Sequence, residues 1–431
     1  MIERGAVLRE DVFSHTLPGR PWSTHEWLSE VLLALAYDAG GWGGVVALAA
    51  AAAGLAAALF ARGLARRLGG VPLACLTALG LACVAPGLLA RPHVLALPCL
   101  VVWADRLLLA REEGRAPPWT LLPVMVLWAN LHGGFAFGLA LIVPFFLEAL
   151  LAAPGGLRAR LVAVRGWIAF GLAAGGAALL TPHGLDGLLF PVRLLGLQSL
   201  DGVTEWRPAD FSRPGPLEIA LLAGLGVCLG RGVTLSPVRI AVLLGLLHMA
   251  LRHGRHEVLF GLVGAMLLAE PLARAVASPP AFASARRGVW ALGLVAVALF
   301  GLRLSVPIAR DDAPAAALAA VPEALRRAPV FNEYGFGGYL IWAGVRPFVD
   351  GRTDFYGDDF MAAYDAAMRP DKRAFEALAA RHGLRWTMLR PGDPLTALLD
   401  ADPDWRRLHT DGRAVVHARR DAEPAALADR R

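Results

Sequence analysis

The stretch "LWANLHGGFAFG", Leu127–Gly138, interrupts an apolar run that extends from residue 121 to residue 151. The run predicts two apolar helices of the kind that cross a bilayer. The two consecutive glycines between them predict a tight turn, because glycine adopts backbone angles that other residues avoid. Either the turn only caps the two helix ends, or it presents Asn130 and His132 at one face of a membrane.

Apolar composition extends over most of the chain. Of its 431 residues, 56% are hydrophobic and 18% are charged, and the mean hydropathy is +0.51. Soluble proteins contain about 25% charged residues, so the composition indicates a polytopic membrane protein whose first partner is the lipid bilayer. The net charge is +6, and nearly all the positive charge comes from arginine. Together with the abundant alanine and glycine, this indicates a GC-rich genome and not nucleic-acid binding. The four cysteines lie in apolar runs without metal-ligand spacing, as small buried side chains do.

Ten apolar ranges are predicted to be membrane-spanning helices. They are 41–61, 71–90, 93–110, 119–131, 134–152, 166–181, 217–230, 239–251, 257–272 and 288–305. Arginine is distributed unequally between the connections, with 14 in one alternating set and six in the other short connections. The positive-inside rule places the arginine-rich set in the cytoplasm. Both ends of the chain are then predicted to lie outside.

Nearly all the unusual polar stretches fall in the outer set of connections. The candidate substrate-binding residues in them are Arg91, His93, Asn130, His132, Glu205, Arg252 and Arg255. Arginine offers several N–H donors that match phosphate oxygens, which favours a site for a phosphate or a sugar. The alternative is that these arginines extend along the lipid head groups and that Asn130 and His132 cap helices.

Residues 1–40 are predicted to form an outer loop that ends in an amphipathic surface helix starting near His25. Asp11 and Glu26 are the candidate catalytic carboxylates of this loop. Trp22 and Trp27 suit the boundary between membrane and water. The alternative for Glu26 is a charge in the first turn of a helix, where the helix dipole favours it.

The composition changes at Pro307, and the chain from 306 to 431 predicts an α/β domain outside the membrane, after a transmembrane domain over 41–305. Helices are predicted over 313–327, 358–368 and 372–383, the last with Gly383 as its C-terminal cap. Strands are predicted over 329–344, 346–352, 384–390 and 413–420. The predicted fold class is thus an all-α transmembrane bundle of about ten helices with a C-terminal α/β domain.

Two polar stretches of this domain, "FNEYGFGGYLIW" (331–342) and "FVDGRTDFYG" (348–357), could line a binding cleft or, with their carboxylates, a divalent-cation site. The alternative is that these residues only build turns between strands. No motif for binding nucleotide phosphates is present, which argues against soluble nucleotide-dependent chemistry. The candidate binding residues here are Asn332, Tyr334, Asp350 and Arg352, with Glu333 and Asp354 beside them.

Several stretches together resemble a family of bacterial multi-span membrane proteins that is similar to the GT-C glycosyltransferases. They are "EDVFSHTLPGRPWSTHEWLSEVLLALAYDAGG" (10–41), "LLARPHVLALP" (88–98), "LWANLHGGFAFGLAL" (127–141), "TPHG" (181–184), "EWRPADF" (205–211), "VFNEYGFGGYLIW" (330–342) and "RPFVDGRTDFYG" (346–357). GT-C enzymes have many spans, an acidic catalytic residue and a surface helix in the first outer loop, and often an outer α/β domain.

The resemblance implies a glycosyltransferase of the bacterial inner membrane that takes a sugar from a polyprenyl-phosphate carrier at the outer face. Glu26 or Asp11 would act as the general base, and the outer arginines would hold the phosphate. The alternative is a protein that binds or moves a lipid-linked polymer, or scaffolds an envelope complex, without catalysis.

The resemblance also implies a further span before "MIERGAVLRED" (1–11), followed by an acidic and aromatic stretch. We therefore expect the gene product to start upstream of Met1, a prediction that the preceding in-frame DNA would test.

Overall fold

Contacts within the chain define two compact units in the computed structural model, which describes residues 1–194, 196–197, 206–281 and 313–422. The helical unit comprises Met1–Val7, His25–Arg193 and Asp201–Pro307, and the sheet unit comprises Leu8–Thr24, Leu194–Leu200 and Ile308–Arg431. Residues 8–24 thus belong to the same unit as the C-terminal part of the chain.

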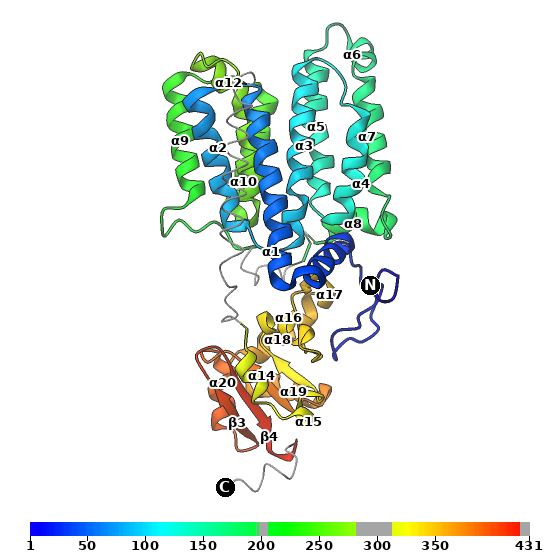
Figure 1. Cartoon of the computed structure of the whole chain (residues 1–431), viewed down its shortest axis with the longest axis vertical. Helices are drawn as coiled ribbons and strands as arrows, with labels where there is room; N and C mark the ends of the chain where they lie inside the picture. The colour runs from blue at the N-terminus through cyan, green and yellow to red at the C-terminus, as the bar shows by residue number, and fades with distance from the viewer. Residues whose placement is uncertain (195, 198–205, 282–312, 423–431) are drawn as a thin grey trace. The chain divides into compact units, whose positions relative to one another are not determined.

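Apolar helices, most of them running side by side, make up the helical unit (Figure 1). They are α1 (Trp27–Ala65), α2 (Gly70–Val84), α3 (Pro92–Glu112), α4 (Leu122–Leu131), α5 (Phe135–Ala152), α6 (Leu157–Ala163), α7 (Arg165–Ala178), α8 (Gly184–Leu194), α9 (Pro216–Arg231), α10 (Pro237–Arg252), α11 (Glu257–Leu259) and α12 (Ala265–Ala275). Short turns of 3-10 helix, η1 (Ala85–Gly87), η2 (Trp119–Leu121) and η5 (Gly254–His256), and the π-helical η6 (Phe260–Gly264) extend or join them. Helices occupy the first nine of the ten predicted ranges, and the tenth, 288–305, lies outside the described residues.

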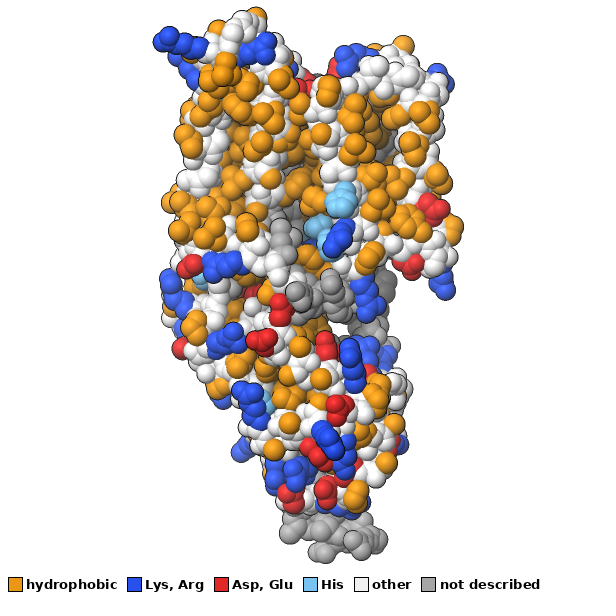
Figure 2. Space-filling view, turned by 180° about the vertical axis from the view of Figure 1, so that it is seen from behind, with side chains coloured by type: hydrophobic (Ala, Val, Ile, Leu, Met, Phe, Trp, Pro, Cys, Tyr) orange, Lys and Arg blue, Asp and Glu red, His pale blue; other side chains and the backbone are white. Residues whose placement is uncertain are grey.

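Five helical segments among the described residues are long and apolar enough to cross a membrane. They are Trp27–Ala65, Gly70–Gly87, Pro92–Glu112, Phe135–Ala152 and Gly254–Ala275. The pair Leu157–Ala163 and Arg165–Ala178, bent by 57°, would be a sixth if it were one broken span. Hydrophobic side chains cover most of the helical unit's visible surface (Figure 2). These features indicate a membrane-associated protein, and the ten spans remain a prediction.

Helix α1 is broken near its first third. Gly40 and Gly41 have non-helical backbone angles, and the φ of Gly41 is 57°, a value that glycine adopts without the steric cost of a side chain. The break separates residues 27–39 from residues 42–65, and Figure 1 shows the first segment turned away from the direction of the second. The Ser29 hydroxyl donates to the carbonyl oxygen of Leu131 at 2.7 Å, which fixes this first segment against the end of α4.

Buried ion pairs join α1 to α3. Arg67 is 6% exposed, and its guanidinium donates to Asp105 and to Glu112, both at 2.8 Å. Arg66 pairs with the same Asp105 carboxylate. An unpaired charge is costly to bury, and here carboxylates of α3 neutralise the arginines. Both arginines belong to the set that was predicted to be cytoplasmic.

A four-stranded sheet forms the centre of the sheet unit. Its strands are β1 (Val330–Asn332), β2 (Trp386–Leu389), β3 (Trp405–Thr410) and β4 (Val415–Arg419), in the order β1-β2-β4-β3. β1 and β2 are parallel, with Val330 opposite Trp386, and the other pairs are antiparallel. The unit's helices are α14 (Ala315–Ala319), α15 (Glu323–Arg326), η7 (Tyr334–Phe336), α16 (Gly337–Trp342), α17 (Thr353–Tyr356), α18 (Asp358–Met368), α19 (Lys372–His382), α20 (Pro394–Ala401) and η8 (Arg420–Ala422).

Part of the predicted secondary structure of this unit is confirmed. The helices predicted over 358–368 and 372–383 are α18 and α19, and Gly383 ends α19 with a φ of 61°. The strands predicted over 384–390 and 413–420 are β2 and β4. The helix predicted over 313–327 is split at Pro322 into α14 and α15, and strand β3 was not predicted.

The strands predicted over 329–344 and 346–352 are wrong beyond the short β1. After Asn332 the chain turns into η7 and α16, and residues 346–352 form no strand. The Asn332 side chain replaces the backbone hydrogen bonds that a neighbouring strand would make. It donates to the Val349 carbonyl oxygen and accepts from the Phe348 amide. A Cβ on Gly337 would lie 2.2 Å from the Val349 oxygen, so the glycine allows α16 to pack directly on this segment.

Candidate functional site

The predicted site residues divide between the two units. The helical unit holds Glu26, Arg91, His93, Asn130, His132, Arg252 and Arg255. The sheet unit holds Asp11, Asn332, Tyr334, Asp350 and Arg352. Glu205 lies outside the described residues. Asp11 and Glu26, which the sequence places in one loop, therefore belong to different structural environments.

Glu26 lies directly before α1 and meets two histidines. Its Oε1 is 3.3 Å from Nε2 of His132 and 3.7 Å from Nε2 of His25. The His25 ring also stacks on Phe190 of α8, with 3.8 Å between the ring centroids. The Glu26 and His132 side chains are 23% and 17% exposed, so the pair is accessible to a ligand but largely shielded from water.

The turn between α4 and α5 holds His132 in one orientation. His132 adopts extended angles at the end of α4, and the Gly134 amide donates to its Nδ1 at 2.9 Å. A Cβ on Gly134 would lie only 2.9 Å from this Nδ1, so the second glycine of "HGG" permits the ring to fold back on the turn. Burial, together with the nearby Arg255, His93 and His25, lowers the pKa of His132 well below its usual range.

Cationic groups surround this pair. The Arg255 guanidinium lies over the Trp206 ring, 4.6 Å from its centroid, and interacts electrostatically with Glu26 and Arg91. His93 lies in the first turn of α3, donates through Nε2 to the Gly87 carbonyl oxygen at 2.7 Å, and places its ring 6.2 Å from that of His132.

We name Glu26, His25, Arg91, His93, His132 and Arg255 the polar cluster. It holds two arginines and one carboxylate, an excess of positive charge that suits an anion. Arg252 lies close by in sequence and is exposed at the end of α10.

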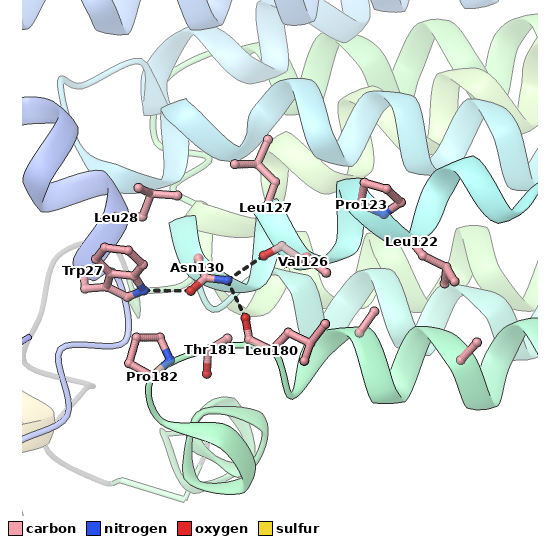
Figure 3. A pocket seen from close by; sticks show the side chains of 12 residues that line it. Trp27, Leu28, Leu122, Pro123, Val126, Leu127, Asn130, Leu180, Thr181 and Pro182 are labelled. Atoms are coloured by element: carbon pink, nitrogen blue, oxygen red, sulfur yellow. Dashed lines mark hydrogen bonds between the residues drawn. The ribbon is translucent and has the colours of Figure 1, made fainter.

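Asn130 connects three segments of the helical unit. Its Oδ1 accepts from Trp27 Nε1 at 2.8 Å, and its Nδ2 donates to the carbonyl oxygens of Val126 and Leu180, as Figure 3 shows. Both amide hydrogens are thus used within the protein. The geometry therefore gives Asn130 a structural part in holding α1 beside α4, next to the polar cluster.

An apolar groove begins at this asparagine and extends between α1, α4 and α7 (Figure 3). Its volume is about 910 Å³, within the range of small-molecule sites. Its lining residues are Trp27, Leu28, Leu122, Pro123, Val126, Leu127, Asn130, Ala173, Ala177, Leu180, Thr181 and Pro182. Trp27 and Asn130 stand beside Glu26 and His132 in sequence, so the groove and the polar cluster share one end of the helical unit.

In the sheet unit, Arg352 is the centre of a buried network. Its guanidinium contacts the Asp11 and Asp350 carboxylates at 2.8 and 2.6 Å, and lies 4.7 Å from the Trp22 ring centroid and 4.8 Å from that of Phe355. Burial opposes its charge, but Asp350 and Asp11 outweigh this effect, so its pKa lies above the ordinary value. Asp11 and Asp350 are each 2% exposed. The network attaches residues 8–24 to the rest of the sheet unit.

Other contacts complete this attachment. The Thr16 hydroxyl donates to the Phe348 carbonyl oxygen at 2.8 Å, and His15 Nε2 lies 2.9 Å from the Val330 oxygen. Within the same unit the Tyr334 hydroxyl bonds to Thr353 at 2.7 Å. Asp11, Asp350 and Arg352 are thus paired with one another, and Tyr334 is bonded to Thr353, so these predicted site residues have a structural part in the sheet unit.

A metal centre finds no support in the described part of the chain, where no group of three or more His, Cys, Asp or Glu side chains is arranged to hold an ion.

Two members of the site region, His25 and Trp206, were not among the predicted site residues. Both lie in the polar stretches of the predicted outer face, so their aromatic rings next to charged residues were the signal that could have identified them.

The apolar helices and the polar cluster define the class as a membrane-associated protein with a cationic site beside an apolar groove. Neither a scan against protein-family models nor a search of curated proteins finds a match.

Proposed function

We propose that the chain is an integral membrane glycosyltransferase of the GT-C kind, which transfers a sugar from a polyprenyl-phosphate carrier to an acceptor hydroxyl. The observation that carries the proposal is the Glu26 carboxylate, 3.3 Å from His132 and among arginines at the end of an apolar groove. The groove suits the first isoprene units of the carrier, and the arginines suit its phosphate.

Each part of the reaction has a candidate group in the polar cluster. Glu26 accepts the proton of the acceptor hydroxyl as general base. The resulting oxygen attacks the anomeric carbon of the sugar, and the bond from that carbon to the phosphate oxygen breaks. Polyprenyl phosphate leaves with the negative charge, which Arg255 and Arg91 stabilise.

Transfer can be measured without knowing the natural acceptor. The full chain in proteoliposomes is supplied with a panel of radiolabelled polyprenyl-phosphate hexoses and pentoses, and the label is followed into envelope lipids and into water. Release or transfer of label from at least one donor supports the proposal. Tight binding of polyprenyl phosphate without release from any donor would reject catalysis and favour the alternative, a protein that only binds or moves lipid-linked polymers.

The phosphate part of the proposal predicts weaker carrier binding when an arginine is removed. Arg255→Ala and Arg91→Ala should each weaken the binding of polyprenyl phosphate by about 1–3 kcal/mol, the cost of losing a charge-assisted hydrogen bond. Titration of the detergent-solubilised chain with a fluorescent polyprenyl phosphate measures this. Arg158→Ala, an exposed arginine of α6, is the matched control and should leave binding unchanged. Equal effects at all three positions would indicate only general attraction of the anion.

The proposal also places the site at the outer face of a bacterial inner membrane, crossed ten times, with residues 306–431 outside. This orientation rests on the arginine distribution. Protease added to intact spheroplasts should remove a C-terminal tag completely. A tag that stays protected until the membrane is lysed would contradict the orientation.

A further inference from the structure

The protonation of His132 follows from its hydrogen bonds. A backbone amide can only donate, so Nδ1, which receives the Gly134 N–H at 2.9 Å, carries no proton. The single proton of a neutral imidazole is then on Nε2, which faces Oε1 of Glu26 at 3.3 Å. A second proton on the ring would break the bond to Gly134.

Four titratable or charged side chains face His132 among the residues that the structure describes. They are Glu26 before α1, His25, His93 on α3 and Arg255 at η5. Burial is the main effect that lowers the pKa of His132, and the neighbouring Arg255 lowers it further. Glu26 is the carboxylate of this set, and its charge favours a second proton on the ring. It contacts the ring edge that already carries the proton, however, and the Gly134 amide occupies the other nitrogen.

We infer that His132 is a positioning residue that orients the Glu26 carboxylate through a permanent Nε2–H and never exchanges that proton during turnover. The inference rests on the proposed function, in which Glu26 is the base. The acceptor proton goes to Glu26 and leaves from Glu26 to water, while His132 keeps its own. The second glycine of "HGG" thus fixes the tautomer of His132, because the Gly134 amide donates to Nδ1 and leaves the proton on Nε2.

Two substitutions separate positioning from proton transfer. His132→Ala should lower kcat by about 100-fold, as misplaced catalytic groups do, with little change in KM for the lipid-linked sugar. His132→Gln keeps an N–H donor near the position of Nε2, and should recover most of the lost kcat. Its pH profile should have the wild-type shape, since glutamine cannot titrate. Loss of one limb of the profile in His132→Gln, or no recovery over His132→Ala, would overturn the inference.

A spectroscopic readout tests the same inference without any activity. In the full chain labelled with ¹⁵N-histidine, the signals that disappear in His132→Gln belong to His132. They should show an unprotonated Nδ1 and a protonated Nε2 from about pH 5.5 to pH 8, because the Gly134 bond excludes the other forms. Protonation of Nδ1 in this range would reject the inference, even in an active enzyme. The predicted tautomer in a chain without transferase activity would reject the proposed function and retain the His132–Glu26 geometry.

Gly134→Ala provides a matched perturbation of the tautomer. The added Cβ would lie 2.9 Å from Nδ1 and 3.6 Å from Trp128 Nε1, so the ring must move. The variant should show a mixed tautomer in the ¹⁵N spectrum and a loss of kcat similar to that of His132→Ala. Gly133→Ala, whose Cβ meets other atoms only at 3.7 Å and beyond, is the control and should retain the wild-type spectrum. An unchanged tautomer in Gly134→Ala would contradict the assignment of the Gly134 amide as its cause.

Discussion

Glu26→Gln should lower the rate of sugar transfer by about 10²–10⁴-fold, the usual contribution of a general base. The amide has nearly the shape of the carboxylate and still accepts from His132, but it cannot take the proton of the acceptor hydroxyl. Removal of the Glu26 carboxylate, which interacts electrostatically with Arg255, also leaves more positive charge at the site. Binding of polyprenyl phosphate should therefore be retained or strengthened while turnover is lost, which steady-state kinetics and carrier titration in proteoliposomes measure together.

The control for this variant is Glu30→Gln, one helical turn further along α1. Glu30 is the carboxylate in the first turn of α1, whereas Glu26 precedes the helix and makes the histidine contacts of the polar cluster. Glu30→Gln should keep transfer within a few-fold of wild type. Transfer by Glu26→Gln at the wild-type rate would exclude Glu26 as the base. Equal losses in both variants would mean that the charge of this turn matters only for structure.

Arg352→Ala should destabilise the sheet unit by about 3–5 kcal/mol, because it leaves two buried carboxylates without their cation. Asp11 and Asp350 are each 2% exposed, so neither can recover its interactions with water. The same change removes the cation that lies over the Trp22 and Phe355 rings. Urea unfolding of the full chain in detergent, followed by limited proteolysis of residues 8–24, measures the loss.

Arg390→Ala is the control for this prediction, since it also removes an arginine paired with a carboxylate of the sheet unit. The Arg390 side chain is 58% exposed and lies 3.4 Å from Glu333, whose side chain is 16% exposed. Water reaches the arginine and weakens the pair, so its loss should cost about 1 kcal/mol. Similar losses for the two variants would contradict the central part given to Arg352. Protection of residues 8–24 in Arg352→Ala would show that the other contacts suffice to attach this segment.

Local pattern was sufficient to predict most of the helices. The apolar ranges of the helical unit and the amphipathic ranges of α18 and α19 depend on side-chain periodicity, which a helix expresses whatever it packs against. Gly383 was predicted as a cap for a similar reason, because the left-handed backbone at a helix end is a local requirement. The strands over 329–352 were also predicted from local pattern, and this prediction was wrong. The Asn332 side chain bonds to the Val349 carbonyl oxygen, and Gly337 packs against the same residue, which is distant in sequence.

Composition and periodicity were enough to predict that the chain is apolar enough for a membrane, where most of its helices lie and which polar residues are candidates for a site. The tertiary structure was needed to show which candidates lie close together. Glu26 contacts His132, whereas Asp11, from the same predicted loop, pairs with Arg352. The physical reason is that helix formation depends on residues within a few turns of one another. The surroundings of a carboxylate depend on which distant donors and cations reach it, and hydropathy and spacing do not encode that partner.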